Sequence, residues 1–364
     1  MRTADAVAHL AAHRVRDLPA YQPGRRSPGP QAGKLSSNES PLGPGPAVRS
    51  ALAAAAASVN RYPEDSGVAG RLAADAGVQA DQLILTNGSD ELCYLLAWIF
   101  LGPGRVAVAG DPCYPIDATV SVLAGAALRR VPLRGGAHDL EAMAEAAQDA
   151  ALVWLPSPHN PTGAAIGPAE LDMFLGRVPP GCVVVLDEAY RAFADPSGWP
   201  DVPRLLGEHP NLLVQRTLSK DWGLAGLRIG YALAAPPVIA ALSRVRPPFS
   251  VSSVAMAAAE AGLREESWRQ MSVARVREER ALLERELAGL GIEYFPSQAN
   301  FVTARLDYAR LTAALEASGI VVRSGEDLGL PGWVRMSIGW APQMAMLRRV
   351  LRTLFDGDTT RRRA

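Results

Sequence analysis

Lysine is the first residue type here that could do distinctive chemistry, because the chain has almost none. Of its 37 basic residues only Lys34 and Lys220 are lysines, and all the others are arginines. A primary amine can form a Schiff base with a carbonyl carbon, whereas a guanidinium group cannot. Drift toward an arginine-rich composition explains the survival of Lys34 equally well. The surroundings of Lys220, however, indicate a reactive amine.

Lys220 follows the apolar run 212–215, in the sequence Leu-Ser-Lys-Asp-Trp-Gly-Leu-Ala-Gly-Leu-Arg. A buried strand over this run would place the lysine just beyond its carboxyl end, where α/β sheets bind ligands. Ser219 and Arg228 flank the lysine with a hydroxyl group and a planar guanidinium group, both of which suit a phosphate. An ordinary surface turn is the alternative interpretation of this motif.

Asp187 ends another apolar run, 183–186, and Tyr190 follows three residues later. A carboxylate at the end of a buried strand is costly unless it meets a cation, and a protonated pyridine nitrogen would supply one. A helix N-cap or a metal-binding Asp-Glu pair would produce the same pattern. Because no histidine or cysteine ligand is nearby, the sequence does not favour a metal site.

Two further motifs follow apolar runs. Asn160 lies between prolines after the run 151–155, so the direction of its amide is restricted. Thr-Asn-Gly-Ser-Asp-Glu at 86–91 joins a predicted strand to a predicted helix, and the backbone N–H groups of such a helix start can bind an anion. An N-cap formed by Ser89 explains the same residues and is compatible with anion binding.

These four motifs share one position, the carboxyl end of an apolar run. Together they suit a ligand with a phosphate, a pyridinium nitrogen, a phenolic oxygen and an aldehyde, which describes pyridoxal 5′-phosphate. Helical segments such as 91–101 and 168–177 separate several of the runs, so we predict a mostly parallel sheet covered on both faces. The predicted strands are 82–86, 105–109, 151–155, 182–186, 212–215 and 229–233.

The last third of the chain predicts a smaller α+β unit. A long helical stretch at 254–287, broken near Arg264, precedes short strands and two more helices. The predicted strands are 293–295, 300–303, 320–322 and 333–338, and the predicted helices are 308–318 and 342–355. We divide the chain into an N-terminal arm with part of the small domain (1–45), a large cofactor-binding domain (46–245), a small domain (246–358) and a disordered tail (359–364).

The overall composition limits the classes of function. Basic and acidic residues both number 37, so the formal charge is zero, which argues against nucleic acid or an anionic membrane as the main partner. No apolar run approaches the roughly 20 residues of a membrane span, and the first 18 residues lack a signal-peptide pattern. Three scattered cysteines suit neither a disulfide framework nor a zinc site. We therefore expect a cytoplasmic protein that acts on small molecules.

The order of the motifs is anion cradle, Asn-Pro-x-Gly, Asp-x-x-Tyr, Ser-Lys and then Arg. This order resembles that of the class I/II aminotransferases of the aspartate-aminotransferase fold, and the resemblance covers residues 16–354. It implies an α/β protein of the pyridoxal-phosphate-dependent transferase fold type I, with a mostly parallel seven-stranded sheet and a smaller α+β domain. It also implies pyridoxal 5′-phosphate as the cofactor and transamination as the reaction.

The resemblance assigns roles to the residues around the cofactor. Lys220 matches the Schiff-base lysine and proton shuttle, and Asp187 matches the partner of the pyridine N–H. Tyr190 and Asn160 match the donors to the phenolic oxygen, and Tyr114 matches the aromatic residue stacked on the ring. The residues that match the phosphate shell are Ser89, Asp90, Ser219, Arg228 and, donated across a dimer interface, Tyr62.

The sequence is similar to histidinol-phosphate aminotransferases in particular. The arm around Tyr21 matches one whose tyrosine reaches the substrate phosphate, and Asn38 lies in a matching substrate loop. Arg323 and Arg335 match the arginines that bind the anionic groups of the substrate. The implied reaction converts L-histidinol phosphate and 2-oxoglutarate to imidazole-acetol phosphate and L-glutamate, in histidine biosynthesis. The implied assembly is a homodimer with shared active sites.

Some residues on the substrate side depart from the family pattern. The loop reads Ser36-Ser-Asn-Glu where an asparagine usually comes first, Phe249-Ser250 replaces a common Tyr-Asn, and Pro115-Ile-Asp replaces a stretch that often carries a second tyrosine. An aromatic or specialised-metabolite aminotransferase and a lyase such as a threonine-phosphate decarboxylase therefore stay open as alternatives. A non-catalytic binding protein is disfavoured, because the lysine and the aspartate are both present.

Overall fold

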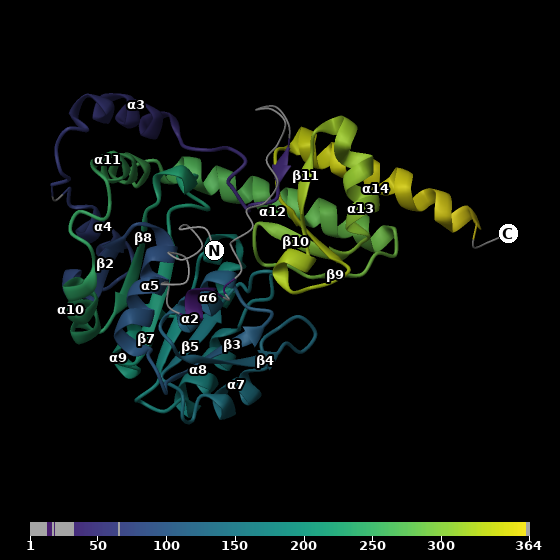
Figure 1. The fold of residues 1–364 in the computed structure, drawn as a ribbon. Helices are drawn as coiled ribbons and strands as arrows, with labels where there is room; N and C mark the ends of the chain where they lie inside the picture. The colour runs from purple at the N-terminus through teal and green to yellow at the C-terminus, as the bar shows by residue number, and fades with distance from the viewer. Residues whose placement is uncertain (1–12, 17, 19–32, 65, 362–364) are drawn as a thin grey trace, which may run out of the picture.

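The protein consists of two units, each built around its own β-sheet (Figure 1). The structure is a computed structural model and describes residues 13–16, 18, 33–64 and 66–361. One unit has a seven-stranded sheet and the other a five-stranded sheet. Within the described ranges, no helix combines the length and the apolar character that crossing a bilayer requires.

The large sheet has the strand order β2-β8-β7-β6-β5-β3-β4. Strand β8 is antiparallel to both of its neighbours, and every other neighbouring pair is parallel, which confirms the predicted mostly parallel sheet. All strands except β4 lie within two residues of a predicted strand. The strands are β2 (Leu83–Thr86), β3 (Val106–Asp111), β4 (Ala127–Pro132), β5 (Leu152–Pro156), β6 (Val183–Asp187), β7 (Leu212–Thr217) and β8 (Gly230–Ala234).

Helices cover both faces of this sheet, because its central strands carry apolar side chains on both sides. Along β5, Leu152 and Trp154 pack into one core, and Val153 and Leu155 pack into the other. The first face is covered by α5 (Gly88–Phe100), α6 (Pro115–Leu123) and α10 (Pro236–Val245). The second is covered by α4 (Val68–Asp75), α7 (Leu140–Ala146), α8 (Pro168–Arg177), α9 (Val202–Glu208) and α11 (Ser253–Gly262), with α3 (Pro46–Ala55) against α11.

Two strands were not predicted from the sequence pattern. Strand β4 is at an edge of the large sheet and carries Arg129 and Arg130, so it has no continuous apolar run to reveal it. Strand β1 (Lys34–Leu35) has two residues and pairs in parallel with β11 of the small sheet. Because Leu35 is buried in the smaller core, the end of the N-terminal arm belongs structurally to the small unit.

The small sheet has the order β1-β11-β12-β10-β9, and its pairs other than β1–β11 are antiparallel. The predicted break near Arg264 is confirmed, since α11 ends at Gly262 and a new helix begins at Glu266. The remaining strands are β9 (Tyr294–Phe295), β10 (Phe301–Arg305), β11 (Val321–Ser324) and β12 (Trp333–Ser337). The remaining helices are α2 (His13–Arg16), α12 (Glu266–Gly289), α13 (Tyr308–Leu315) and α14 (Ala341–Arg361).

The packing of α11 bears on the predicted domain boundary. Ala255 and Ala259 of α11 pack into a core of the large sheet, whereas Leu283 of α12 packs into the core of the small sheet. The division into domains remains a prediction, and this packing favours a boundary near Arg264 over one at residue 246. At the other end, α14 continues to Arg361, past the predicted helix end at 355 and into the stretch predicted as a tail.

Candidate active site

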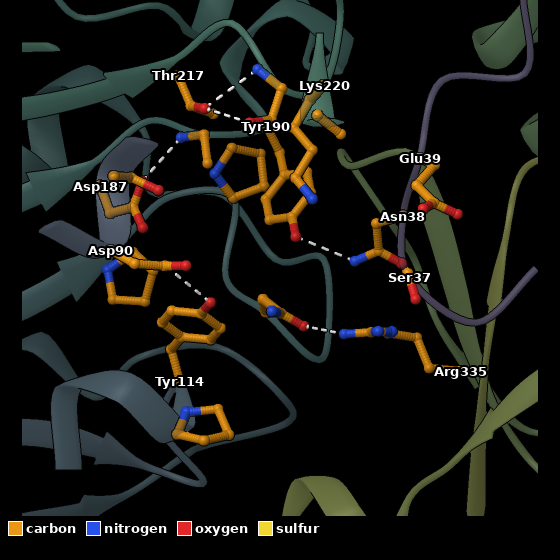
Figure 2. A pocket seen from close by; sticks show the side chains of 18 of the residues that line it. Ser37, Asn38, Glu39, Asp90, Tyr114, Asp187, Tyr190, Thr217, Lys220 and Arg335 are labelled. Carbon is orange, nitrogen blue, oxygen red and sulfur yellow. Dashed lines mark hydrogen bonds between the residues drawn. The ribbon is translucent and has the colours of Figure 1, made fainter. Parts of the chain in front are cut away.

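A pocket of about 240 Å³ lies where the carboxyl ends of β6 and β7 face the small sheet (Figure 2). It brings together twelve of the fourteen residues predicted to form the site; the exceptions are Tyr21, which is outside the described residues, and Tyr62. The pocket therefore forms at the strand ends where α/β sheets bind ligands. The twelve are Asn38, Ser89, Asp90, Tyr114, Asn160, Asp187, Tyr190, Ser219, Lys220, Arg228, Arg323 and Arg335.

Asp187 and Lys220 lie on the large-sheet wall of the pocket. Asp187 is the last residue of β6, and its Oδ1 accepts the N–H of Ala189 at 2.9 Å. Burial raises the pKa of the Asp187 carboxyl to about 6; the nearby Asp90 raises it too, whereas the Ala189 N–H and the Lys220 charge lower it. Lys220 Nζ lies 5.5 Å from the centre of the Tyr190 ring. Among the described residues it has no hydrogen-bond or ion-pair partner.

Tyr190 and Asn160 are held by the opposite wall in a way that leaves donors available. Asn38 Nδ2 donates to Tyr190 Oη at 3.0 Å, so the phenol hydrogen of Tyr190 is free for another acceptor. Arg335 Nη1 donates to Asn160 Oδ1 at 2.5 Å, so the Asn160 amide nitrogen points elsewhere. Ser337 Oγ fixes Asn38 by donating to its Oδ1 at 2.7 Å. Figure 2 shows the bond from Asn38 to Tyr190 and the bond from Arg335, which join the two walls.

The start of α5 lies beside Arg228, which in turn contacts Ser219. The alternative interpretation of Ser89 as the N-cap is wrong, because Asn87 is the N-cap. Asn87 forms no side-chain cap, so no capping side chain accepts the first backbone N–H groups of α5. Gly88 has φ of 74°, and a Cβ there would lie 2.5 Å from Arg228 Nη2. Only a glycine therefore lets the guanidinium group approach this helix start so closely.

Asp90 orients its neighbours. Its Oδ1 accepts the Tyr114 hydroxyl at 3.1 Å, and its Oδ2 accepts Arg228 Nη2 at 3.2 Å. Because both carboxylate oxygens are engaged in this way, the backbone N–H of Asp90 is the group suited to a phosphate. The carboxylate instead fixes the ring of Tyr114 and the guanidinium group of Arg228.

Arg323 and Arg335 lie side by side on the small-sheet wall. They are direct partners in the β11–β12 register, and both are buried. Arg335 Nη2 also donates to Ser36 O at 3.1 Å, and Arg323 Nε lies 3.4 Å from Asp327 Oδ2. Two adjacent guanidinium groups suit a multiply charged anion such as a phosphate monoester.

Tyr62 lies outside the pocket of its own chain. Its side chain is 75 % exposed, and its ring stacks on that of Phe249 with the ring centres 4.4 Å apart. Phe249 is also exposed, so the two rings form an apolar patch on the surface. The predicted contribution of Tyr62 to a second chain's site, like that of Tyr21, remains a prediction.

Residues with positive φ angles lie in the pocket and in the Tyr62–Phe249 stack. Among the described residues the non-glycine cases are Asn38 (φ 54°), Arg228 (φ 53°) and Phe249 (φ 57°). Such backbone conformations are strained and persist only where the surroundings impose them. Asn38 and Arg228 line the pocket and Phe249 supports Tyr62, so the strain is concentrated at positions with a predicted binding role.

Sequence reasoning missed the residues behind Asp187. Gln215 of β7 lies directly opposite Asp187 in the β6–β7 register. Cys93 Sγ lies 3.6 Å from Gln215 Oε1 and 3.8 Å from Asp117 Oδ1. The available signal was a glutamine directly after the three apolar residues that begin β7.

His159, to which the sequence assigned no role, is buried. Its ring nitrogens contact Thr162 Oγ1 at 2.9 Å and Pro112 O at 3.1 Å. Burial lowers the pKa of its imidazole well below the usual range. These contacts account for His159 as a structural residue.

The donor set fits pyridoxal 5′-phosphate. The uncapped helix start, Ser219 and Arg228 suit the phosphate, and the Asp187 carboxylate suits a protonated ring nitrogen. The available donors of Tyr190 and Asn160 suit the phenolic oxygen, and the Lys220 amine suits the aldehyde. Each polar group of that ligand therefore has a complementary group in the pocket.

Comparison with known proteins agrees with this fit. The family model described as aminotransferase class I and II matches residues 31–354. Histidinol-phosphate aminotransferase 1 of Dechloromonas aromatica is 38% identical, covering 95% of this chain and 99% of its own length. Histidinol-phosphate aminotransferase of Brevibacillus brevis is 35% identical, with coverages of 94% and 98%.

A solved structure shows the same fold. Histidinol-phosphate aminotransferase from Sinorhizobium meliloti, crystallised with pyridoxal-5′-phosphate, superposes with a TM-score of 0.84 at 28% identity. The match covers 94% of this chain and 98% of that one. The two-sheet architecture, the pocket at the strand ends and the family match over most of the chain lead to one conclusion: this chain belongs to the class I and II aminotransferases.

Proposed function

We propose that this protein is a pyridoxal-phosphate-dependent aminotransferase that moves the amino group of L-histidinol phosphate to 2-oxoglutarate. The products would be imidazole-acetol phosphate and L-glutamate, in the histidine biosynthesis of the cytoplasm. The observation that supports this choice of substrate is the buried pair Arg323 and Arg335, which lie side by side in the pocket. Relatives with the name of this activity, similar over nearly the whole chain, support the same choice.

The large-sheet wall would hold the cofactor. The backbone N–H groups at the start of α5, with Ser219 and Arg228, would bind its phosphate. Asp187 would keep the ring nitrogen protonated, and Tyr190 and Asn160 would donate to the phenolic oxygen. When bound, pyridoxal 5′-phosphate supplies an aldehyde that accepts the amino group and a ring that accepts the electron pair of the broken Cα–H bond.

The chain's own proton carrier would be Lys220. Its amine would hold the cofactor through the aldehyde, and as a free amine it would accept and carry the proton of the substrate Cα. Among the described residues Lys220 Nζ has no partner that would hold it back. Arg323 and Arg335 would fix the anionic ends of the substrate, so that the Cα–H bond faces the amine.

The substrate assignment can be tested with a half-reaction. Holoenzyme is mixed with histidinol phosphate, with histidinol, or with phenylalanine, and the visible band of the cofactor is followed. We expect histidinol phosphate to convert the cofactor to its amine form fastest and at the lowest concentration. Faster conversion by phenylalanine would support an aromatic aminotransferase instead, and release of carbon dioxide from a phosphorylated amino acid would support a lyase.

We also propose that the active form is a homodimer in which Tyr62 and Tyr21 complete the site of the other chain. The exposed Tyr62–Phe249 stack supports this proposal, since a large apolar pair on a surface favours an interface. A Lys220→Ala chain is mixed with a chain carrying Tyr62→Ala and Tyr21→Ala. If sites are shared, one site of each heterodimer has no lesion, and activity returns to about a quarter of wild type. No recovery despite verified subunit exchange would contradict sharing.

A further inference from the structure

The inference concerns Gln215, Cys93 and Asp117, three buried residues that lie behind Asp187, away from any predicted contact with a ligand. Gln215 is 2 % exposed, Cys93 is 1 % exposed and Asp117 is 6 % exposed. They come from three elements, β7, α5 and α6, which also carry other parts of the pocket. Polar groups this deep in an apolar core are costly unless they are hydrogen-bonded, so their arrangement calls for an explanation.

Gln215 is aligned with Asp187 by the sheet itself. The two residues are direct Cα partners in the parallel strands β6 and β7, so their side chains lie on the same face. The Gln215 side chain lowers the pKa of the Asp187 carboxyl, as an amide N–H that faces a carboxylate does. The only group with which a glutamine can donate is its amide nitrogen, so that nitrogen faces Asp187.

Cys93 determines which way the amide points. Its Sγ lies 3.6 Å from Gln215 Oε1, so the thiol donates to the amide oxygen and directs the amide nitrogen to Asp187. On its other side, Sγ lies 3.8 Å from Asp117 Oδ1. Burial raises the pKa of the Asp117 carboxyl and of the Cys93 thiol well above their usual ranges.

The donors therefore run in one direction. Cys93 donates to the Gln215 amide oxygen, and the Gln215 amide nitrogen faces the Asp187 carboxylate. Other charged groups that act on Asp187 are Asp90 at the start of α5 and Lys220 after β7. The series thus adds stabilisation of an anion at a position where burial opposes one.

We propose that Gln215 is a positioning residue for the reaction, which holds the Asp187 carboxylate ionised and aimed at the cofactor nitrogen, and that Cys93 fixes the orientation of Gln215. This inference rests on the proposed role of Asp187. It concerns residues that touch neither the cofactor nor the substrate.

The test uses holoenzyme and two readouts besides activity: the dissociation constant for pyridoxal 5′-phosphate and the pH midpoint of the visible cofactor band. Gln215→Met keeps the side-chain length and removes the donor. We expect it to weaken cofactor binding about tenfold, the scale of one hydrogen bond to a charged group. It should also move the pH midpoint in the same direction as Asp187→Asn does. Gln215→Glu, which adds a second carboxyl beside Asp187, should have a larger effect.

Cys93 offers a milder pair of variants. Cys93→Val removes the thiol hydrogen at similar volume and should move both readouts in the direction of Gln215→Met, by a smaller amount. Cys93→Ser keeps a donor and should stay near wild type. If Cys93→Ser and Cys93→Val change both readouts equally, the thiol acts only by packing and its orienting role is overturned.

Asn211 supplies the structural control. Its amide, directly before β7, donates to Cys182 O at 2.8 Å and to Pro179 O, away from Asp187. Asn211→Leu should lower thermal stability and leave both cofactor readouts unchanged. If it shifts them as Gln215→Met does, a general loosening of β7 explains the effect and the inference is wrong.

The two proposals fail in distinguishable ways. If Asp187→Asn alters neither readout, the role of Asp187 is wrong and the proposed function must be revised. If Asp187→Asn alters both readouts and Gln215→Met alters neither, the proposed function stands and the positioning role of Gln215 is overturned.

Discussion

The two walls of the pocket are built on different principles. On the large-sheet wall, Asp187, Ser219 and Lys220 lie at or just beyond the ends of regular strands, and Lys220 Nζ has no hydrogen-bond partner among the described residues. On the small-sheet wall, Asn38 and Arg335 are held by hydrogen bonds to residues far away in the sequence. One wall therefore presents reactive groups from a rigid scaffold, and the other wall is assembled by long-range contacts.

The comparison predicts that lesions on the large-sheet wall stop the chemistry, and the largest effect should come from Lys220. Lys220→Ala removes the only amine in the pocket as far as the structure describes it, and Lys220→Arg supplies a group that neither forms a stable imine nor releases a proton near neutral pH. Both variants should have no measurable turnover. If either variant turned over substrate at the wild-type rate in a steady-state assay, the assignment of the lysine would be contradicted.

The next largest effect should come from Asp187→Asn. The amide keeps the shape of the carboxylate but cannot stabilise a proton on the ring nitrogen. We expect the single-turnover rate to fall by more than tenfold, which corresponds to about 1.4 kcal/mol of barrier. A rate within tenfold of wild type would show that Asp187 does not have the proposed role in the reaction.

The same substitution should stabilise the protein without cofactor. Burial raises the native pKa of Asp187 to about 6, above the value of about 3.9 in an unfolded chain. The native state therefore binds this proton more tightly, and the stability that it contributes is present below pH 4 and lost as the pH rises through 6. Asp187→Asn should unfold like wild type at pH 4 and be about 3 kcal/mol more stable at pH 8. Urea titrations at the two pH values measure this difference; equal stability at pH 8 would contradict it.

A smaller effect is expected on the other wall, from Arg335→Lys. Lysine keeps the charge but loses the planar fork that binds Asn160 and a substrate anion together. We expect the KM for the amino donor to rise about tenfold, the scale of one charge-assisted hydrogen bond. The matched control is Arg305→Lys, on the same sheet but exposed and paired with Glu293. If Arg335→Lys also shifts the cofactor band, the two walls are coupled through Asn160.

The two walls also differ in how well the sequence predicts them. The large-sheet wall could be predicted, because Asp187 and Lys220 each follow an apolar run and strand ends converge in a parallel sheet. On the small-sheet wall the family resemblance identified Asn38 and Arg335. Their partners, such as Ser337 and Ser36, are fixed only by contacts between segments about 300 residues apart.

The features that the sequence did not predict share a physical cause. Strand β4 lies at a sheet edge, where exposed arginines replace the apolar run on which the strand predictions depended. The link between Gln215 and Asp187 depends on the register of β6 with β7, which no local pattern determines. The series through Cys93 depends in addition on how α5 packs against that sheet.

The smallest effect is expected from the other lysine. Lys34 Nζ pairs with Glu39 Oε1 at 2.7 Å, and both side chains are more than a third exposed. Exposed ion pairs contribute about 0.2–1 kcal/mol, and Lys34→Arg preserves the charge, so the unfolding free energy should change by less than about 0.5 kcal/mol. Turnover should stay near wild type. Borohydride reduction of the holoenzyme should attach the cofactor to the peptide that contains Lys220, in wild type and in Lys34→Arg alike. Attachment to Lys34 in the wild type would mean that Lys34, on the small-sheet wall, is the reactive amine and that Lys220 is not.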